Sequence, residues 1–351
     1  MASPRNILIL GASYGSLLAT KLLLAGQKVS LVCHSHEADL INSEGTRVRI
    51  PLRGREGSVE LHSKTLPGRL DACTPDGADP SQYDLIGLAM QEPQYRCADV
   101  RELLGRIADS AKPVMSIMNM PPLPFLARIP DLELNDLRSC YGDARVWDGF
   151  DPDLFTLASS DPQAFRPSGS PPNILRVTLA TNFKVPRFED AAATAVLAEL
   201  GSAIEAARFD LGDGIPSELP VKLRLHNSFF VPLAKWSMLL TGNYRCVEAD
   251  GIRSIRDAVH ADLAASRDIY NWVGDVCRAI GAKDTDLVSF EDYANAALSL
   301  AEPSSAARAL ASGATDIERV DLLVQRVGTS KGMRHPNVDA TVEMVDSWLL
   351  R

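Results

Sequence analysis

The chain of 351 residues has a formal net charge of −9 at pH 7, with 46% hydrophobic and 23% charged residues. This composition is typical of a globular protein long enough for two domains, and the acidic balance without a basic stripe excludes nucleic acid as an expected partner. No apolar run reaches the roughly 18 residues of a membrane-spanning helix, so no membrane partner is expected. Because the opening residues MASPRN lead directly into an apolar strand, we expect no signal peptide and a cytoplasmic location.

The cysteines are scattered along the chain, without a C-x-x-C pair or a zinc-binding spacing. This pattern is typical of reduced thiols in a cytoplasmic protein, and we expect no metal site. The six positions are Cys33, Cys73, Cys97, Cys140, Cys246 and Cys277.

Residues 5–34 predict a strand, a tight turn, a helix and a second strand. The runs Asn6–Leu10 and Val29–Cys33 are short and apolar, and apolar residues recur at helical spacing between them as far as Gly26, a residue typical of a helix C-terminus. Such a βαβ unit binds phosphate through its first turn, because glycine lets the backbone approach a pyrophosphate and the helix N-terminus offers free N–H groups.

The first turn departs from the usual G-x-G-x-x-G pattern of dinucleotide-binding proteins. It reads Gly11, Ala12, Ser13, Tyr14 and Gly15, one glycine short of the pattern. Since the turn follows the first strand and precedes a helix, we predict that these five residues bind a dinucleotide. The alternative is a turn that only joins the strand to the helix.

The residue at the end of the second strand selects the cofactor in such a unit. A carboxylate there accepts hydrogen bonds from the ribose of NAD, whereas a basic residue favours the 2′-phosphate of NADP. This chain has Cys33, His34, Ser35 and His36 at that place, and Glu37 follows. We therefore predict NADP, with NAD as the alternative, and a cofactor contact from His34; a surface histidine without a ligand is the other interpretation.

The following segments continue the alternation of strands and helices. We expect a β-hairpin over 47–63, a helix over about 98–110, and strands over 83–90, 113–118 and 173–180. This order predicts a parallel sheet with right-handed crossovers.

Ligands of parallel sheets lie beyond the carboxyl ends of the strands. Gly11, Gln91 and Asn119 each follow a predicted strand, and Gln94 lies close after Gln91. The sequence therefore predicts a cofactor site at this edge that includes Gln91, Gln94 and Asn119.

The composition changes in the second half of the chain. Residues 120–172 are rich in proline, aspartate and serine and indicate long loops with short strands, whereas the chain after about residue 189 is helical. We predict a Rossmann-type NAD(P)-binding domain over 1–187 and an all-α substrate and dimerisation domain over 188–351. The later helices are expected at 219–240, 253–280, 288–301, 304–327 and 338–350.

The expected helix over 219–240 is apolar nearly all round and carries a polar set. Its members are Lys222, His226, Asn227 and Lys235, with Asn243 just beyond. Buried polar groups must be hydrogen-bonded, or each costs roughly 1–3 kcal/mol. Either the lysines extend to the helix ends and Asn227 bonds to backbone, or the set lines a cleft.

A second polar set lies near the C-terminus. Ser304 and Ser305 precede Asp316 and Glu318 by about a dozen residues. Serine and threonine are preferred helix N-caps, so capping is one interpretation. It is compatible with the other, substrate binding, because a helix N-terminus attracts anions.

Together these patterns resemble the ketopantoate reductase family, 2-oxo-acid reductases that use NADPH. The likeness runs over nearly the whole chain. Its motifs are the glycine turn, Ala89-Met90-Gln91, Met118-Asn119-Met120 (similar to the family's N-G-M), His226-Asn227 with Val231-Pro232-Leu233-Ala234 (similar to N-x-x-x-N-P-L-x-A), Ser304-Ser305, Thr315-Asp316-Ile317-Glu318, and Gly332 before Pro336.

The resemblance implies roles for individual residues. It implies an α/β fold with a helical second domain of the 6-phosphogluconate dehydrogenase type. It also implies a catalytic role for Asn119, in orienting substrate and cofactor, and substrate binding by Asn227, Ser304 and Asp316. In the family a lysine on the long helix protonates the carbonyl oxygen as hydride arrives.

This lysine does not match in position. The fourth residue before Asn227 is Leu223, and Lys222 lies one place earlier, a rotation of about 100° on a helix. A bend could restore Lys222, or His226 or Lys235 could supply the proton. Because the developing alkoxide needs a positioned acid, the departures predict a substrate other than ketopantoate.

We therefore predict an NADP-dependent oxidoreductase that reduces a 2-oxo acid or related small carbonyl compound, with Lys222 or His226 as the acid. An opine-type dehydrogenase is the alternative enzyme; it would centre on a His–Asp arrangement that the sequence does not reveal. A non-catalytic nucleotide-binding protein is the alternative from another class. A homodimer through the helical domain is a further expectation.

Overall fold

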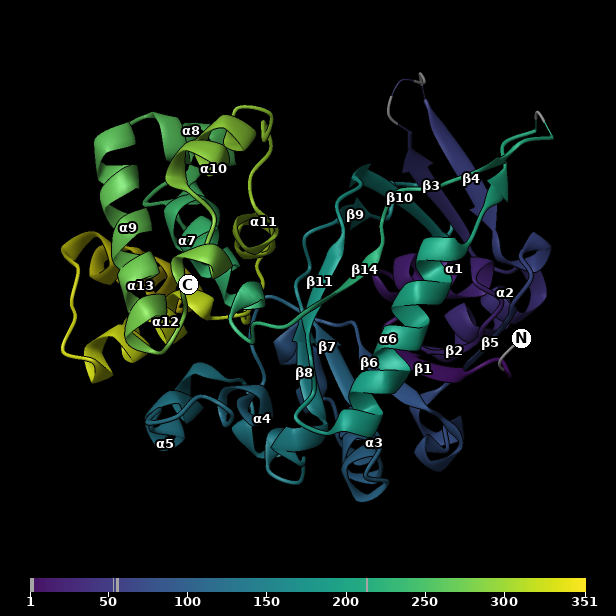
Figure 1. The fold of residues 1–351 in the computed structure, drawn as a ribbon. Helices are drawn as coiled ribbons and strands as arrows, with labels where there is room; N and C mark the ends of the chain where they lie inside the picture. The colour runs from purple at the N-terminus through teal and green to yellow at the C-terminus, as the bar shows by residue number, and fades with distance from the viewer. Residues whose placement is uncertain (1–2, 53, 55–56, 213) are drawn as a thin grey trace. The chain divides into compact units, whose positions relative to one another are not determined.

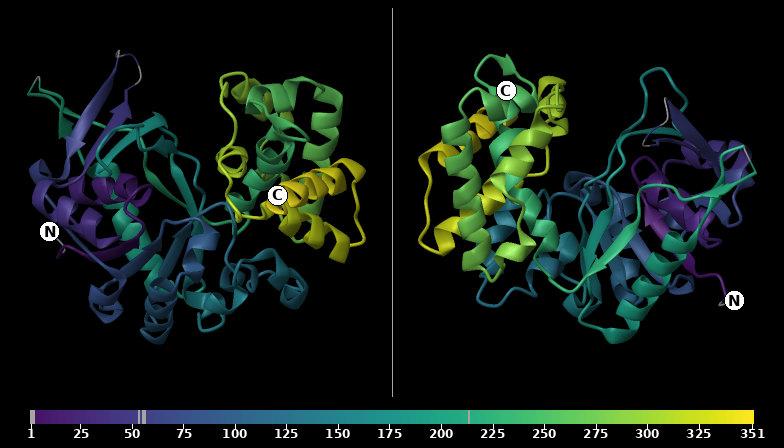
Figure 2. Two further views of the ribbon diagram at one scale, coloured as in Figure 1. Left: turned by 180° about the vertical axis from the view of Figure 1, so that it is seen from behind. Right: turned by 45° about the horizontal axis from the view of Figure 1, so that its top comes forward.

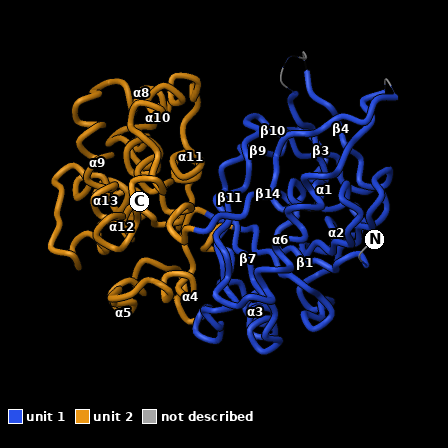
Figure 3. Tube along the Cα trace, viewed as in Figure 1, with its two compact units in different colours: residues 1–90, 94–118, 146–227 blue, residues 91–93, 119–145, 228–351 orange. Residues whose placement is uncertain are grey.

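The computed structural model describes residues 3–52, 54, 57–212 and 214–351. The chain forms two compact units (Figure 3). The sheet unit contains residues 1–90, 94–118 and 146–227, and the helical unit contains residues 91–93, 119–145 and 228–351.

A six-stranded parallel sheet forms the centre of the sheet unit (Figure 1). Its strand order is β5-β2-β1-β6-β7-β8, and every neighbouring pair is parallel. Strands of such sheets are apolar throughout because both faces are covered. The arrangement confirms the predicted α/β fold class with a Rossmann-type sheet. The strands are β1 (Asn6–Leu10), β2 (Lys28–Val32), β5 (Arg69–Cys73), β6 (Leu85–Leu88), β7 (Val114–Ile117) and β8 (Phe155–Ala158).

Helices cover the faces of this sheet. Helix α1 is buried along its whole length because it packs against β1, β2, β3 and α6. The predicted helix over 98–110 is confirmed as α3. The helices of the unit are α1 (Gly15–Leu24), α2 (Ser35–Glu44), α3 (Ala98–Asp109) and α6 (Ala191–Ala206).

A second sheet has the order β4-β3-β10-β9. It confirms the expected hairpin over 47–63 and the strand over 173–180, although the hairpin's residues 53, 55 and 56 lie outside the described residues. Its strands are β3 (Arg47–Pro51), β4 (Ser58–His62), β9 (Gln163–Phe165) and β10 (Ile174–Leu179). Two strand pairs complete the unit: β11 (Phe183–Pro186) with β14 (Leu223–His226), and β12 (Phe209–Asp210) with β13 (Pro216–Ser217).

The expected helix over 219–240 is wrong in its first half. Residues 223–226 form strand β14, parallel to β11, because two leucines alternate with Arg224 and His226 at the period of a strand. The helix begins only after Pro232, a residue suited to a first helical turn. It consists of α7 (Lys235–Met238) and a π-helical turn, Leu239–Asn243.

The helical unit is arranged around this π-helical turn, which packs against α8, α9 and α12. Helices α12 and α13 lie side by side (Figure 2). In the part of the chain that the structure describes, none of the helices has both the length and the apolar character to cross a membrane. The elements are α4 (Leu123–Leu126), α5 (Leu134–Leu137), α8 (Ile255–His260), α9 (Leu263–Ala279), α10 (Phe290–Ala297), α11 (Ser305–Ala311), α12 (Val320–Ser330), α13 (Pro336–Leu349), β15 (Val247–Glu248) and β16 (Gly251–Ile252).

Two predicted helices of this unit are each divided. The expected helix over 253–280 is interrupted at Asp262, whose side chain accepts a hydrogen bond from the Ala265 N–H and starts α9. The expected helix over 304–327 is separate helices α11 and α12. Residues 188–227 belong to the sheet unit, because α6 packs against α1, β6 and β14. The domain boundary expected after residue 187 stays a prediction.

Lys21 is a charged residue in the interior of the sheet unit. Its side chain lies on α1, only 1% exposed, and its Nζ donates to the carbonyl oxygens of Pro220 at 2.9 Å and Leu219 at 3.4 Å. Burial lowers the pKa of Lys21 to about 7, and the charge of Lys222 acts in the same direction. Lys222 is itself buried, with its Nζ 2.9 Å from a carboxylate oxygen of Glu218.

This burial predicts a pH-dependent stability that Lys21→Met removes. Between pH 7 and the ordinary lysine pKa of 10.5, the unfolded chain holds a proton that the folded protein has released. Lys21 therefore makes the free energy of unfolding rise with pH in this window, by up to about 1.4 kcal/mol per pH unit. Urea denaturation from about pH 7 to pH 9 measures the free energy of unfolding of both proteins. The value for the wild type minus the value for Lys21→Met should rise with pH. A constant difference would show that the buried amine keeps its charge.

Candidate active site

The glycine turn between β1 and α1 has no room for side chains at its two ends. Gly11 has φ +98°, and a Cβ there would lie 2.6 Å from Met90 Cγ and 2.8 Å from the Ala89 carbonyl oxygen. A Cβ on Gly15 would lie 2.7 Å from Ile9 Cγ2. These contacts bring the turn against the end of β6 and set α1 directly on β1.

The residues of the turn fit a dinucleotide phosphate. Gly11 has no side chain that would keep a phosphate from its backbone. The ten-residue helix α1 begins at Gly15 and has no acidic residue in its first turn, which favours anion binding at its N-terminus. Ala12 is buried, and the Ser13 carbonyl accepts from the Ser16 N–H at 3.2 Å. The side chain of Tyr14 has a structural contact: its hydroxyl donates to the Pro162 carbonyl oxygen at 2.6 Å.

The end of β2 carries the residues expected near the adenosine ribose. His34 is exposed and precedes α2, and the Cys33 N–H donates to the Cys73 carbonyl at 3.0 Å. Burial raises the pKa of the Cys33 thiol to about 12, with Glu37 contributing. Glu37 is 9% exposed and forms an ion pair with Arg166.

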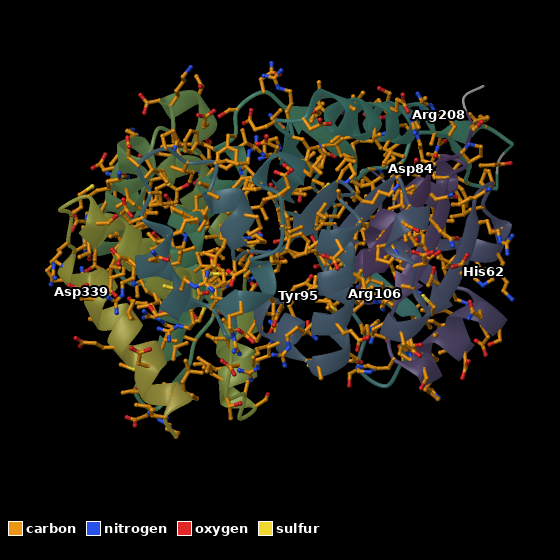
Figure 4. The ribbon with its side chains drawn as sticks, turned by 90° about the horizontal axis from the view of Figure 1, so that it is seen from below. His62, Asp84, Tyr95, Arg106, Arg208 and Asp339 are labelled. Carbon is orange, nitrogen blue, oxygen red and sulfur yellow. The ribbon has the colours of Figure 1, made fainter. Side chains whose placement is uncertain are left out.

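The loop after β6 is fixed by a buried tyrosine. Tyr95, labelled in Figure 4, is fully buried, and its hydroxyl accepts from the Met90 N–H at 3.0 Å. Its ring packs on Trp147 with centroids 5.4 Å apart. Gln94 is exposed within the short helical turn Glu92–Arg96.

A polar pocket lies in the helical unit. Gln91 and Asn119, both predicted to contact a ligand, line it together. They are joined by Asn243 from the π-helical turn, Ser305 from the start of α11, and Glu318 from the segment before α12. Amides, a hydroxyl and a carboxyl group thus converge from five separate segments of the chain.

Glu318 is the buried acid of this pocket. It is 7% exposed, and its carboxyl oxygens accept from Asn119 Nδ2 at 3.1 Å and from the Glu92 N–H at 3.4 Å. Burial raises its pKa, while the hydrogen bond from Asn119 and the positive charge of Lys235 act in the opposite direction. The hydrogen bond from Asn119 and the charge of Lys235 thus favour the carboxylate form against the cost of its burial.

The backbone around Glu318 is held by Tyr244. The hydroxyl of this fully buried residue donates to the Glu318 carbonyl oxygen and accepts from the Val320 N–H at 3.0 Å. The neighbouring Arg319 pairs with Asp321 at 3.0 Å and with Asp346 at 2.6 Å. These contacts hold the backbone on the C-terminal side of Glu318.

In each of the two pairs near the C-terminus, Ser304 with Ser305 and Asp316 with Glu318, one member lines the pocket and the other does not. Ser304 is the N-cap of α11: its Oγ accepts from the Ala307 N–H at 3.1 Å and donates to the Asn243 carbonyl at 2.7 Å. Ser305, one residue later, lines the pocket. Glu318 lines it as well, whereas Asp316 is not among its lining residues. A cap and the residue after it point in different directions, which the sequence motif alone did not resolve.

The residues expected on the long helix are also divided between the units. Lys222, His226 and Asn227 belong to the sheet unit, on or beside β14, whereas Lys235 and Asn243 belong to the helical unit. Burial and the charge of Lys184 lower the pKa of His226, and Asn227 is exposed.

A histidine–aspartate pair, which the opine-type alternative requires, is present in the helical unit. His335 Nε2 lies 3.0 Å from Asp268 Oδ2. His335 is also the N-cap of α13, accepting from the Asn337 N–H at 3.2 Å, and its ring packs on Trp272. Among the described residues that line the polar pocket, neither member of the pair is found.

The comparisons with known proteins bear on this fold. No protein-family model matches the chain, and no curated protein matches it in sequence. The fold, a Rossmann-type parallel sheet with a helical second part, is nevertheless shared with solved structures.

Solved structures that are similar over the full length include ketopantoate reductases, which confirms the resemblance in fold. One is a candidate ketopantoate reductase from Ralstonia solanacearum MolK2 (16% identity, 99% of this chain and 98% of that chain, TM-score 0.71). Another is the 2-dehydropantoate 2-reductase from Methylococcus capsulatus (16%, 99% and 97%, 0.66). A third is the dimeric ketopantoate reductase from Staphylococcus aureus (9%, 98% and 99%, 0.55).

The contacts of Tyr244 predict a stability effect. In Tyr244→Phe the Glu318 carbonyl and the Val320 N–H lose a buried partner, and we expect the free energy of unfolding to fall by about 1–3 kcal/mol. Urea denaturation measures it. Tyr83→Phe, which removes the hydroxyl of a partly exposed tyrosine hydrogen-bonded to Ser30, is the matched control. It should lower stability by less than Tyr244→Phe does, because its hydroxyl has a single partner among the described residues. Equal effects of the two substitutions would contradict the assigned role.

Proposed function

We propose that the protein is an NADP-dependent oxidoreductase that reduces a 2-oxo acid or a related small carbonyl compound by hydride transfer. The observation that carries the proposal is the pocket that Asn119, Asn243 and Ser305 line together with the buried Glu318, on a chain with the fold of ketopantoate reductases. These are the groups that hold a small polar substrate through hydrogen bonds.

The dinucleotide would be held by the glycine turn. The backbone of residues 11–15 and the N-terminus of α1 face the pyrophosphate in this proposal, and His34, Gln91, Gln94 and Asn119 stay proposed contacts. When bound, the reduced nicotinamide supplies the hydride.

Lys235 is the residue that we propose as the acid. It opens α7, and the helical stretch that follows carries Leu239 and Asn243 into the pocket. Its charge acts on the Glu318 carboxyl group. Lys222, by contrast, is buried in an ion pair with Glu218. In our account the Lys235 ammonium gives its proton to the carbonyl oxygen as the carbon accepts the hydride.

The lining of the pocket also bears on the substrate. Ser305 and the two asparagine amides can donate to a carboxylate, and Glu318 can accept from a substrate hydroxyl. Leu239 adds an apolar wall. We propose a small 2-oxo acid with an apolar portion.

The assembly and location form part of the proposal. The similar structure from Staphylococcus aureus is dimeric, and we propose a homodimer for this chain. We further propose that it acts in the cytoplasm.

The proposal is tested by measuring kcat/KM for the wild type and for Lys235→Met. NADPH oxidation is followed with a panel of small 2-oxo acids that includes ketopantoate. The variant should lower kcat/KM by roughly 10²–10⁴-fold, the contribution of a positioned acid, while the Kd for NADPH is unchanged. Lys331→Met is the matched control in the same unit; its Nζ donates to the Asp131 carbonyl at 2.9 Å.

Three other results would each favour an alternative: another acid, imine reduction, or cofactor binding without catalysis. Loss of turnover in Lys222→Met or His226→Gln, with Lys235→Met active, would contradict the assignment of the acid. A requirement for an added amino acid would indicate imine reduction, as in opine-type dehydrogenases. Cofactor binding without turnover on any carbonyl compound would indicate a non-catalytic nucleotide-binding protein.

A further inference from the structure

The segment from Ser159 to Arg166, which includes β9, is attached at two points to the edge of the sheet where parallel strands end. At the first point the Pro162 carbonyl accepts the hydrogen bond from Tyr14, in the turn that follows β1. At the second point Arg166 pairs with Glu37, in the first turn of the helix that follows β2. Both attachments lie within the sheet unit.

The second attachment occupies the place where a Rossmann-type sheet meets the adenosine ribose of its cofactor. That place is the carboxyl end of the second strand. Cys33 is the first residue beyond β2, and the charges of both Glu37 and Arg166 act on its thiol, in opposite directions. The ion pair therefore lies at the tip of β2, where the sequence alone shows no basic residue beyond two histidines.

Arg166 has bonding capacity that its ion pair does not use. Its Nη2 donates to Glu37. Its Nε is buried and has no hydrogen-bond partner among the described residues, although the side chain as a whole is 33% exposed. A guanidinium group offers five N–H donors in a planar fork that matches the oxygens of a phosphate.

We propose that Arg166 selects NADP over NAD by binding the 2′-phosphate of the adenosine ribose, and that Glu37 limits the strength of this selection. The inference rests on the proposed dinucleotide function and names the residues behind its cofactor choice. Glu37 holds the guanidinium at the tip of β2 and repels the incoming phosphate. With NAD, the same carboxylate is placed to accept hydrogen bonds from the ribose hydroxyls.

Direct binding to the full-length protein tests the proposal. The Kd values for NADPH and NADH are measured by isothermal titration calorimetry for the wild type, Arg166→Met and Glu37→Gln. The control is Arg176→Met, which removes an exposed arginine of β10, paired in register with Phe165.

We expect Arg166→Met to change the Kd for NADPH but not the Kd for NADH. Arg166→Met weakens NADPH binding by about tenfold or more, the loss of a hydrogen bond to a charged group. It leaves NADH binding unchanged, because NADH carries no 2′-phosphate. Glu37→Gln tightens NADPH binding and does not tighten NADH. Arg176→Met changes neither.

Equal effects of Arg166→Met on NADPH and NADH, or no effect on either, would overturn the proposal. If Arg166→Met does not fold, the Kd values of Glu37→Gln test the proposal instead. A lower Kd for NADPH is expected in this variant only if a phosphate lies beside the carboxylate of Glu37. A wild-type protein that binds neither cofactor would overturn the proposed function itself. That result is distinct from a protein that binds both equally, which overturns the preference for NADP and the role of Arg166 but leaves the proposed dinucleotide-binding function standing.

Discussion

The absence of space for a side chain at Gly11 is the constraint on which the sheet unit depends. The turn after β1 lies so close to the Ala89 carbonyl and the Met90 side chain that only glycine fits, in a left-handed conformation. Gly15 then lets α1 pack directly on Ile9. Because β1 lies between β2 and β6, this contact places the end of the central strand, the start of α1 and the loop after β6 together at one edge.

The helical unit depends on a different constraint, the burial of polar groups. Glu318 is tolerated in the interior because Asn119 and the Glu92 N–H bond to its carboxyl group and Tyr244 holds its backbone. The sheet unit thus offers bare backbone suited to phosphates, and the helical unit offers side chains suited to a small polar molecule. Lys21, a buried basic residue of the sheet unit, is held by hydrogen bonds to two carbonyl groups of the chain.

The fold was predictable wherever the signal was local. The strands β1, β2, β6 and β7 are short apolar runs with helices between them, and the sequence located each within two residues. Strand β14 was missed because its partner β11 is distant in sequence. The sequence identified the segments that form the pocket but not always the side chains that line it. Ser304 was predicted and caps α11, while Ser305 lines the pocket; Asp316 was predicted, while Glu318 lines it. Arg166 was beyond prediction, since its partner Glu37 lies 129 positions away.

The most direct measurement is the thermal unfolding midpoint of the wild-type protein with saturating NADPH and, separately, NADH. A ligand at 100 times its Kd stabilises the folded state by about 2.7 kcal/mol, which corresponds to a rise of roughly several degrees for a chain of this size. The account predicts such a rise, larger with NADPH than with NADH at equal concentration. An unchanged midpoint with both cofactors would contradict it, because the glycine turn would then only join β1 to α1.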